Sequence, residues 1–251
     1  MTHTFRYGCA LIKLSGRALS GPGGFGFDSS LVAAIAQQIG RLAKSGIQMA
    51  LVVGGGNFLR GAVASAAGME RTTADFAGML ATVINSLVLQ DALVKEGVDV
   101  RIQSAIAIPA IGEPYGQRRA VHHLERGRVV IFAGGTGNPY LTTDTAAALR
   151  AVEVGAEVLL MGKHGVDGVY DVDPRKKAKA KKFDRITYAE ALRMHLEVMD
   201  STAFTLCMEH KLPIIVFDLQ APYSIERALS GEAIGTLVCE TEVQGDRRRS
   251  N

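Results

Sequence analysis

The sequence contains no tryptophan and only three cysteines, Cys9, Cys207 and Cys239, which lie far apart. No CxxC or Cys/His spacing accompanies them, so the pattern excludes a disulfide framework and gives no sign of a zinc site. Unpaired thiols are typical of a reducing compartment. The sequence therefore predicts a cytoplasmic location.

Long apolar runs are also missing. The N-terminal stretch carries one Arg and then apolar residues that Lys13 interrupts, and nowhere do 18 apolar residues run together. A membrane-spanning helix needs about 20 apolar residues, and a signal peptide needs an apolar core. We therefore expect neither of them.

The chain has no large excess of one charge. Its formal net charge is +3, and six basic residues gather within 175–182 alone. Such a run is typical of a solvated loop, so we assign it no role with nucleic acids. With 47% hydrophobic and 21% charged residues, the 251-residue chain has the composition of a folded protein of one large or two small domains.

Short apolar runs alternate with segments of helical periodicity. Continuous apolar runs favour parallel strands buried on both faces, and here they cover 7–13, 48–53, 98–103, 128–133, 157–161 and 213–218. Helix starts are indicated by Asp28, by Thr72 and Thr73 before 74–96, and by the capping box from Thr187 to Glu190. The pattern predicts an open α/β sheet with helices on both faces.

Glycines cluster directly after four of these strands. The chain has 28 glycines, and the clusters lie at 14–16, 54–57, 134–138 and 162–165. At the carboxyl edge of a parallel sheet, glycine turns present backbone N–H groups to an anion, which favours a phosphate-rich ligand over merely tight turns. Lys13 ends the first strand and is placed to reach a phosphate oxygen; a lysine that extends to the surface is the alternative.

The common nucleotide motifs are absent. The only Gly-Lys pair has Glu157 where a Walker A loop requires its first glycine, and Leu59 replaces the last glycine of a dinucleotide fingerprint. The protein-kinase signatures fail at Asp75-Phe76-Ala77, and Lys13 breaks the G-x-S-x-G pattern.

Seven segments, in this order, resemble the bacterial uridylate kinases of the amino-acid-kinase superfamily. They are IKLSGRAL (12–19), GFGFD (24–28), VVGGGNFLRG (52–61), ADFAGMLATVIN (74–85), GGTGNPYLTTDTAAALRA (134–151), GVDGVYDVDP (165–174) and VMDSTAFTLCMEHKLPI (198–214). The resemblance implies a single three-layer α/β/α domain over 1–251 with a mostly parallel open sheet and a flexible tail at 240–251. It also implies a homohexamer that transfers a phosphoryl group reversibly from MgATP to UMP, in pyrimidine nucleotide biosynthesis.

The resemblance further implies roles for individual residues. The catalytic set would be Lys13, Asp144 and Lys163. The ATP set, from the C-terminal half and the first two glycine turns, would be Lys13, Leu14, Ser15, Gly16, Gly56, Arg60, His164, Tyr170 and Asp173. The UMP set, mainly from the N-terminal half, would be Gly55, Asp75, Thr136, Gly137, Asn138, Pro139, Tyr140, Leu141, Thr142 and Thr143. The site for an activating GTP would be Gly21, Pro22, Gly23, Gly24, Phe25 and Gly26. UTP would inhibit, and Mg²⁺ would be held mainly by nucleotide phosphates rather than by protein ligands.

A phosphate acceptor fits this set of site residues, which contains no assigned catalytic base. The second pKa of a phosphate is about 6, so the acceptor is largely a dianion at neutral pH and needs no base. We accordingly interpret His122 and His123 as residues of a surface helix. Arg17 and His164 depart from the family pattern. Two alternatives remain, a carboxylate kinase of the same superfamily and a nucleotide-binding storage or regulatory protein, and Asp75 with the intact TGNPYLTT segment favours UMP. The helix at 74–96 is apolar on more than one face and fits either a subunit interface or a core.

Overall fold

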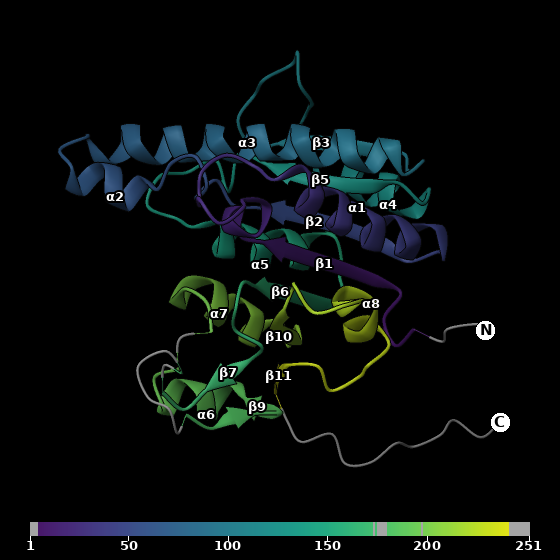
Figure 1. The fold of residues 1–251 in the computed structure, drawn as a ribbon, viewed down its shortest axis with the longest axis vertical. Coiled ribbons are helices and arrows are strands. Elements are labelled where there is room, and N and C mark those ends of the chain that lie inside the picture. Colours follow the sequence, from purple (N-terminus) through teal and green to yellow (C-terminus); the bar gives the residue numbers. More distant parts are fainter. Residues whose placement is uncertain (1–4, 173, 175–179, 197, 241–251) are drawn as a thin grey trace.

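The predicted strands pair side by side in one nine-stranded sheet (Figure 1). The structure is a computed structural model that describes residues 5–172, 174, 180–196 and 198–240. The strands are β1 (Cys9–Leu14), β2 (Gln48–Val53), β3 (Val100–Ser104), β4 (Glu113–Pro114), β5 (Val129–Ala133), β6 (Val158–Lys163), β7 (Val169–Tyr170), β8 (Lys182–Phe183), β9 (Arg185–Thr187), β10 (Ile214–Asp218) and β11 (Thr236–Cys239). All six predicted strands are confirmed, each within two residues.

The sheet runs in the order β4-β3-β5-β2-β1-β6-β10-β11-β9. Only β10 and β11 pair antiparallel within it, and β7 with β8 forms a separate two-stranded ribbon. The predicted mostly parallel α/β sheet is confirmed. Because β5, β2, β1 and β6 are parallel neighbours, the four glycine turns that follow them emerge at one edge.

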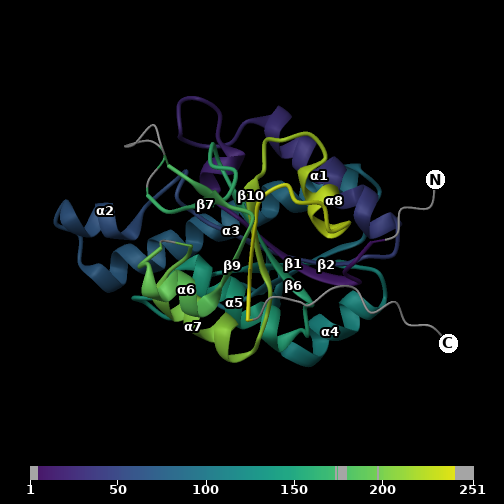
Figure 2. The ribbon, with the colours of Figure 1, turned by 90° about the horizontal axis from the view of Figure 1, so that it is seen from below.

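Helices cover both faces of the sheet, as Figure 2 shows. Helices α1, α3 and α8 pack on one face, and α4, α5, α6 and α7 pack on the other. The helices are η1 (Gly16–Leu19), α1 (Ser29–Lys44), α2 (Gly61–Ala66), α3 (Arg71–Lys95), α4 (Gln117–Glu125), α5 (Thr143–Glu153), α6 (Tyr188–Arg193), α7 (Ser201–Glu209) and α8 (Ser224–Leu229).

Two of the three predicted helix starts are confirmed. Asp28 accepts hydrogen bonds from two backbone N–H groups of α1, and Thr187 with Glu190 forms a capping box at α6. The start of α3 differs, because Glu70 caps it in place of Thr72 or Thr73. The Glu70 carboxylate accepts both threonine N–H groups at 3.0 and 2.7 Å, which a single hydroxyl does less well.

Helix α3 meets the length and hydropathy criteria for a membrane span, with a mean hydropathy of 1.5 over 18 residues. The sequence expectation counted only unbroken apolar runs, whereas this test tolerates polar residues between them. No other helix in the described part of the chain meets it. Leu89 and Leu93 of α3 are fully buried against the sheet, and the core helix of a globular protein passes the same test.

The interpretation of the histidine pair as surface residues is wrong for His123, which is only 8% exposed. Its Nε2 atom lies 3.1 Å from a Glu113 oxygen, and its Nδ1 atom lies 3.0 Å from Nη1 of Arg128. Ala120 and Leu124 are buried on the same helix, and His123 shares their face at helical spacing. The ring is therefore part of a buried polar network.

A pair of buried side-chain amides holds the glycine turn after β2 to α3. Asn85 donates to the Gly54 carbonyl at 2.7 Å and exchanges hydrogen bonds with Asn57. Asn57 also donates to the carbonyl of Gly26 at 2.6 Å. Two residues thus connect three segments that line the edge of the sheet.

We expect Asn85→Ala to reduce the free energy of unfolding by about 2 kcal/mol, because it leaves buried partners of the amide unpaired. Denaturant titration followed by circular dichroism measures the change. Gln37→Ala on the exposed face of α1 is the matched control. Equal stability of the two variants would contradict the structural importance of the pair.

Candidate active site

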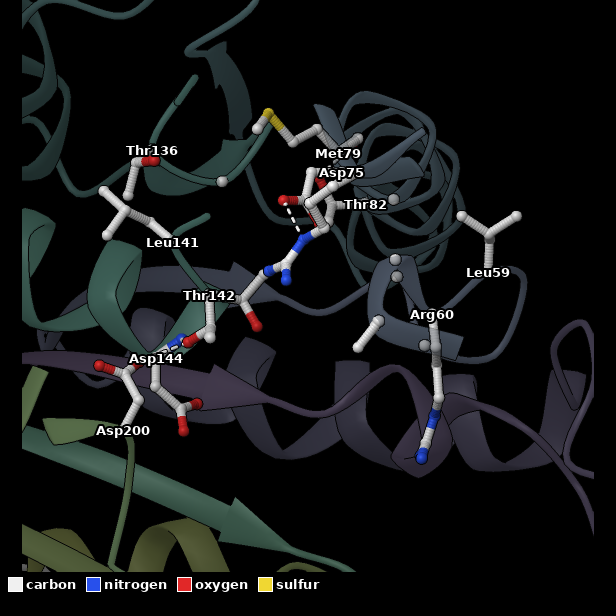
Figure 3. Close-up of a pocket in the computed structure, with 18 of the residues that line it drawn as sticks. Leu59, Arg60, Asp75, Met79, Thr82, Thr136, Leu141, Thr142, Asp144 and Asp200 are labelled. Atoms are coloured by element: carbon white, nitrogen blue, oxygen red, sulfur yellow. Dashed lines mark hydrogen bonds and ion pairs between the residues drawn. The ribbon is translucent and has the colours of Figure 1, made fainter. Parts of the chain in front are cut away.

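The glycine turns after β2 and β5 line a cavity of about 590 Å³ at the carboxyl edge of the central strands (Figure 3). Side chains from β1, α3, α5 and the loop before α7 face it. Its lining is Lys13, Gly55, Gly56, Leu59, Arg60, Gly61, Ala62, Arg71, Asp75, Gly78, Met79, Thr82, Gly135, Thr136, Leu141, Thr142, Thr143, Asp144 and Asp200.

Glycines are required where the first two turns meet. A Cβ atom on Gly16 would lie 2.4 Å from the Asn57 side-chain oxygen and 2.8 Å from the Gly56 nitrogen. A Cβ atom on Gly55 would lie 2.6 Å from the Gly78 carbonyl oxygen in α3. The missing side chains allow both turns and α3 to approach closely, which leaves backbone groups at the cavity wall.

An ion pair lies on the floor of the cavity. Nζ of Lys13 is 2.8 Å from Oδ1 of Asp144, with the two side chains 13% and 18% exposed. This buried oxygen has no aligned hydrogen-bond donor among the described residues, so the ion pair is its main polar contact. Burial alone would raise the pKa of the Asp144 carboxyl, but the ammonium groups of Lys13 and Lys163 outweigh it and hold that pKa below its ordinary value.

A second lysine lies behind this pair at the end of β6. Nζ of Lys163 donates to the Val198 carbonyl at 3.0 Å. Burial lowers the pKa of Lys163; the negative charge of Asp144 opposes this shift without reversing it, and the positive charge of Lys13 adds to it. The three predicted catalytic residues therefore form one electrostatic cluster.

Asp200 is a cavity residue that the sequence analysis did not assign. Its carboxylate accepts hydrogen bonds from the hydroxyl of Thr142 and from the backbone and hydroxyl of Thr145, and it caps α7 through the Ala203 N–H group. It holds the N-termini of α5 and α7 together beside the cavity. The Asp-Ser-Thr sequence before an apolar helix signals such a cap.

Asp75 lies on the wall opposite Asp144 and Asp200 in Figure 3. Its Oδ2 atom accepts hydrogen bonds from Nε of Arg71 and from the backbone N–H of Tyr140, both at 2.8 Å. Tyr140 has a φ of 70°, a left-handed conformation that costs a residue with a side chain about 1–3 kcal/mol. The bond to Asp75 helps to hold the loop after β5 in this conformation.

The structure brings together most of the predicted acceptor residues. Gly55, Asp75, Thr136, Leu141, Thr142 and Thr143 line the cavity. The rest of the loop, Gly137, Asn138, Pro139 and Tyr140, is not part of the lining, and Tyr140 reaches it only through the bond to Asp75.

The predicted donor residues divide between two cavities. Lys13, Gly56 and Arg60 line the first, while Leu14, Ser15 and Gly16 are not part of its lining. Gly56 also lines a second cavity of about 840 Å³, together with His164, Arg17 and the predicted activator residues Gly21, Pro22, Gly23 and Gly24. The two cavities therefore adjoin at Gly56.

Several predicted residues lie away from both linings. Phe25 is exposed and packs edge-on against Phe58, while the Gly26 N–H group donates to the Asn57 carbonyl. The Tyr170 hydroxyl donates to Asp167, which raises the pKa of that hydroxyl. Asp173, residues 175–179 of the basic run and residues 241–251 of the expected tail lie outside the described residues.

Within the described ranges, no three His, Cys, Asp or Glu side chains gather closely enough to hold a metal ion. Asp144 and Asp200 are the carboxylates nearest the cavity floor, and both are already engaged by protein groups. A divalent cation here would depend mainly on oxygens that a ligand supplies.

We expect Asp144→Asn to lower the free energy of unfolding at neutral pH by roughly 3 kcal/mol, because two buried ammonium groups lose their counter-charge. The lowered pKa of Asp144 means that its contribution is present above 3.8, the ordinary value, and is lost as the pH falls through the folded-state pKa. Unfolding titrations from pH 7 to pH 2 should therefore show the two proteins converging in acid.

Asp91→Asn provides the control for this comparison, because Asp91 forms an exposed pair with Lys95 on α3. That exposed pair should contribute less than about 0.5 kcal/mol. A stability difference between Asp144→Asn and the native protein that persists undiminished in acid would contradict the interpretation.

The chain was compared with known protein families and with individual proteins. A sequence model described as the amino acid kinase family matches residues 8–218. Over 237 residues the chain is 54% identical to a uridylate kinase of Streptomyces avermitilis, with 94% of this chain and 93% of that protein covered.

Solved structures agree with this match. A UMP kinase from Bacillus anthracis superposes with a TM-score of 0.91 at 40% identity, covering 94% of this chain and 97% of that one. A UMP kinase from Ureaplasma parvum superposes with a TM-score of 0.89 at 37% identity, covering 94% and 100%. The family match includes Lys13, Lys163 and the four glycine turns, and this chain belongs to the amino acid kinase family.

Proposed function

We propose that this chain is a uridylate kinase, which transfers the terminal phosphoryl group of ATP to UMP and yields ADP and UDP. The carrying observation is the buried Lys13–Asp144 pair at the meeting point of two glycine turns, in a chain 54% identical to a uridylate kinase. The reaction is a step of pyrimidine nucleotide biosynthesis.

The two adjoining cavities suit two nucleotides. UMP occupies the cavity bounded by Asp75 and Thr136, and ATP approaches from the side of His164, so that their phosphates meet near Gly56 and Lys13. The N-terminal half of a single domain thus serves mainly the acceptor, and the C-terminal half serves mainly the donor.

The protein promotes the reaction by aligning the two nucleotides and by compensating the negative charge of their phosphates. The acceptor phosphate is largely a dianion at neutral pH, since its second pKa is about 6, and needs no base. Lys13 and Lys163 reduce the repulsion between the two polyanions, and Asp144 keeps the Lys13 ammonium group in place. The N-termini of α5 and α7, which Asp200 holds, add partial positive charge beside the phosphates.

Mg²⁺ fits this site as an ion that binds together with the nucleotide, and not as one that the protein holds by itself. Asp144 is ion-paired with Lys13, and Asp200 accepts hydrogen bonds from protein groups, so phosphate oxygens would supply most of the ligands. When bound, the ion neutralises charge on the phosphates and helps to orient them.

The chain works as a homohexamer in this proposal. Four apolar residues on one face of α3 are each more than a third exposed, and they recur at helical spacing: Phe76, Leu80, Ile84 and Leu87. A contiguous apolar stripe on a surface helix favours burial against another subunit. GTP activates through the loop at Gly21–Gly26, and UTP inhibits.

The proposed location is the cytoplasm. Burial raises the pKa of the Cys9 thiol to about 11 and that of Cys207 to about 12. Both remain protonated and poorly reactive at neutral pH, which suits a compartment in which disulfides do not form.

The function is tested by ADP release with MgATP and a panel of acceptors: UMP, CMP, dTMP, aspartate and acetylglutamate. We expect turnover with UMP alone, a loss of kcat of about 10²-fold or more in Lys13→Ala, and a KM for UMP raised about tenfold in Asp75→Asn. Lys95→Ala, on the exposed end of α3, should behave like the native protein.

Other results would favour the alternatives. Turnover with aspartate or acetylglutamate would identify a carboxylate kinase. ATP binding by calorimetry without turnover of any acceptor would contradict the kinase proposal and favour a storage or regulatory protein.

Assembly is tested separately. Ile84→Glu places a charge in the apolar stripe of α3, and we expect it to shift the sedimentation of the native oligomer toward smaller species. Ala34→Glu on the exposed face of α1 is the control and should leave the mass unchanged. A monomeric native protein would refute the stripe as an interface.

A further inference from the structure

Arg71 is a cavity residue to which neither the sequence pattern nor the comparisons assign a role. It is the first residue of α3, and its side chain lines the first cavity. Its Nε atom donates to Oδ2 of Asp75 at 2.8 Å, while its Cζ atom lies 5.3 Å from the centre of the Tyr140 ring. Arg71 therefore contacts both the carboxylate and the loop residue whose N–H group binds the same carboxylate oxygen.

Helix stability does not account for this arginine. A cation at the first position of a helix faces the positive end of the helix dipole, where acidic residues are favoured. An ion pair with the basic residue N-terminal to the acidic one is also the less favourable order along a helix. Arg71 is placed against both preferences, which points to a role at the cavity.

Because of this contact, the two carboxylate oxygens of Asp75 have different hydrogen-bond partners. Oδ2 already accepts from Arg71 and Tyr140. Oδ1 accepts no hydrogen bond from the described residues and lies against Gly61, where a Cβ atom would come within 2.5 Å of it. With Oδ2 doubly occupied, the carboxylate cannot rotate freely, and Oδ1 is the acceptor left for a ligand.

Arg71 also keeps donors of its own. Its Nη1 and Nη2 groups have no partner in the described part of the chain, and its side chain is 41% exposed at the cavity. The guanidinium group thus holds Asp75 through Nε alone, and no other group of the described residues pulls it away from this carboxylate.

We propose that Arg71 is a positioning residue for the acceptor nucleotide: it locks Asp75 and Tyr140 so that Oδ1 of Asp75 accepts a hydrogen bond from a hydroxyl or N–H donor of the nucleoside. The inference rests on the proposed function of this cavity. It adds a residue that acts mainly through Asp75, and it links acceptor recognition to the conformation of the loop after β5.

The experiment compares Arg71→Ala and Arg71→Lys with the native enzyme in steady-state kinetics. Arg71→Ala is expected to raise the KM for UMP about tenfold or more, the scale of one charge-assisted hydrogen bond, with the KM for ATP changed less than about twofold. Arg71→Lys keeps the charge without the planar fork and should lie between the two. Lys95→Ala breaks another ion pair of the same helix, away from the cavity, and is the matched control.

A double-mutant cycle with Asp75→Asn tests whether Arg71 acts through Asp75. The combined variant is expected to have nearly the same KM for UMP as Asp75→Asn alone, because the orienting contact has already lost its target. Independent, multiplicative effects on this KM would overturn the proposal. So would an Arg71→Ala enzyme in which both KM values and the thermal midpoint change together, since that is the pattern of a merely structural residue.

Calorimetric titration of UMP separates this inference from the kinase proposal. If the native protein binds UMP without turning it over, the proposed function fails, yet a tenfold or greater weakening of UMP binding in Arg71→Ala still supports the positioning role. Equal UMP affinity of native protein and Arg71→Ala, or no UMP binding by either, would overturn it.

Discussion

The active site depends on a cluster of buried charged side chains whose charges must stay compensated. Lys13 and Lys163 are both largely buried, and the Asp144 carboxylate pairs with Lys13 and interacts electrostatically with Lys163. Because an unpaired buried charge costs several kcal/mol, about 3–5 when one partner is removed, the ends of β1 and β6 and the first turn of α5 must keep their relative positions. Asp200 extends the same constraint to α7 by bonding to Thr142 and Thr145. The cavity floor is therefore defined by four elements that cannot shift independently.

The walls of the cavity are built differently. Glycine turns and the buried amides of Asn57 and Asn85 bring backbone close to backbone, and the absence of side chains leaves room for phosphates. On the opposite wall, Arg71, Asp75 and Tyr140 connect the start of α3 to the loop after β5. A charged floor between such walls suits a reaction in which two polyanions must be aligned.

Much of this arrangement was predictable from the chain alone. Each of the six apolar runs became a strand, the Asp28 and Thr187 caps are present, and the ordered motifs identified the family that the comparisons confirm. Each failure has its own physical reason. Glu70 replaced the expected threonine cap because a carboxylate reaches two N–H groups, and His123 is buried because it shares a helix face with Ala120 and Leu124. The sequence signals Asp200 only as a helix cap, because its bonds to Thr142 and Thr145 join a distant segment. It gives no sign that Arg71 and Asp75 face a cavity together with Tyr140.

The sequence by itself determined the parallel α/β architecture, the edge at which the glycine turns gather, and the family, since apolar periodicity and glycine spacing are local properties written along the chain. Only the tertiary structure decided that Lys13 pairs with Asp144, that one oxygen of Asp75 accepts from both Arg71 and Tyr140, and that two cavities adjoin at Gly56. Those facts depend on distances between residues more than 60 positions apart, or on which oxygen a neighbour occupies. Packing of the whole sheet, and not any single segment, sets such distances.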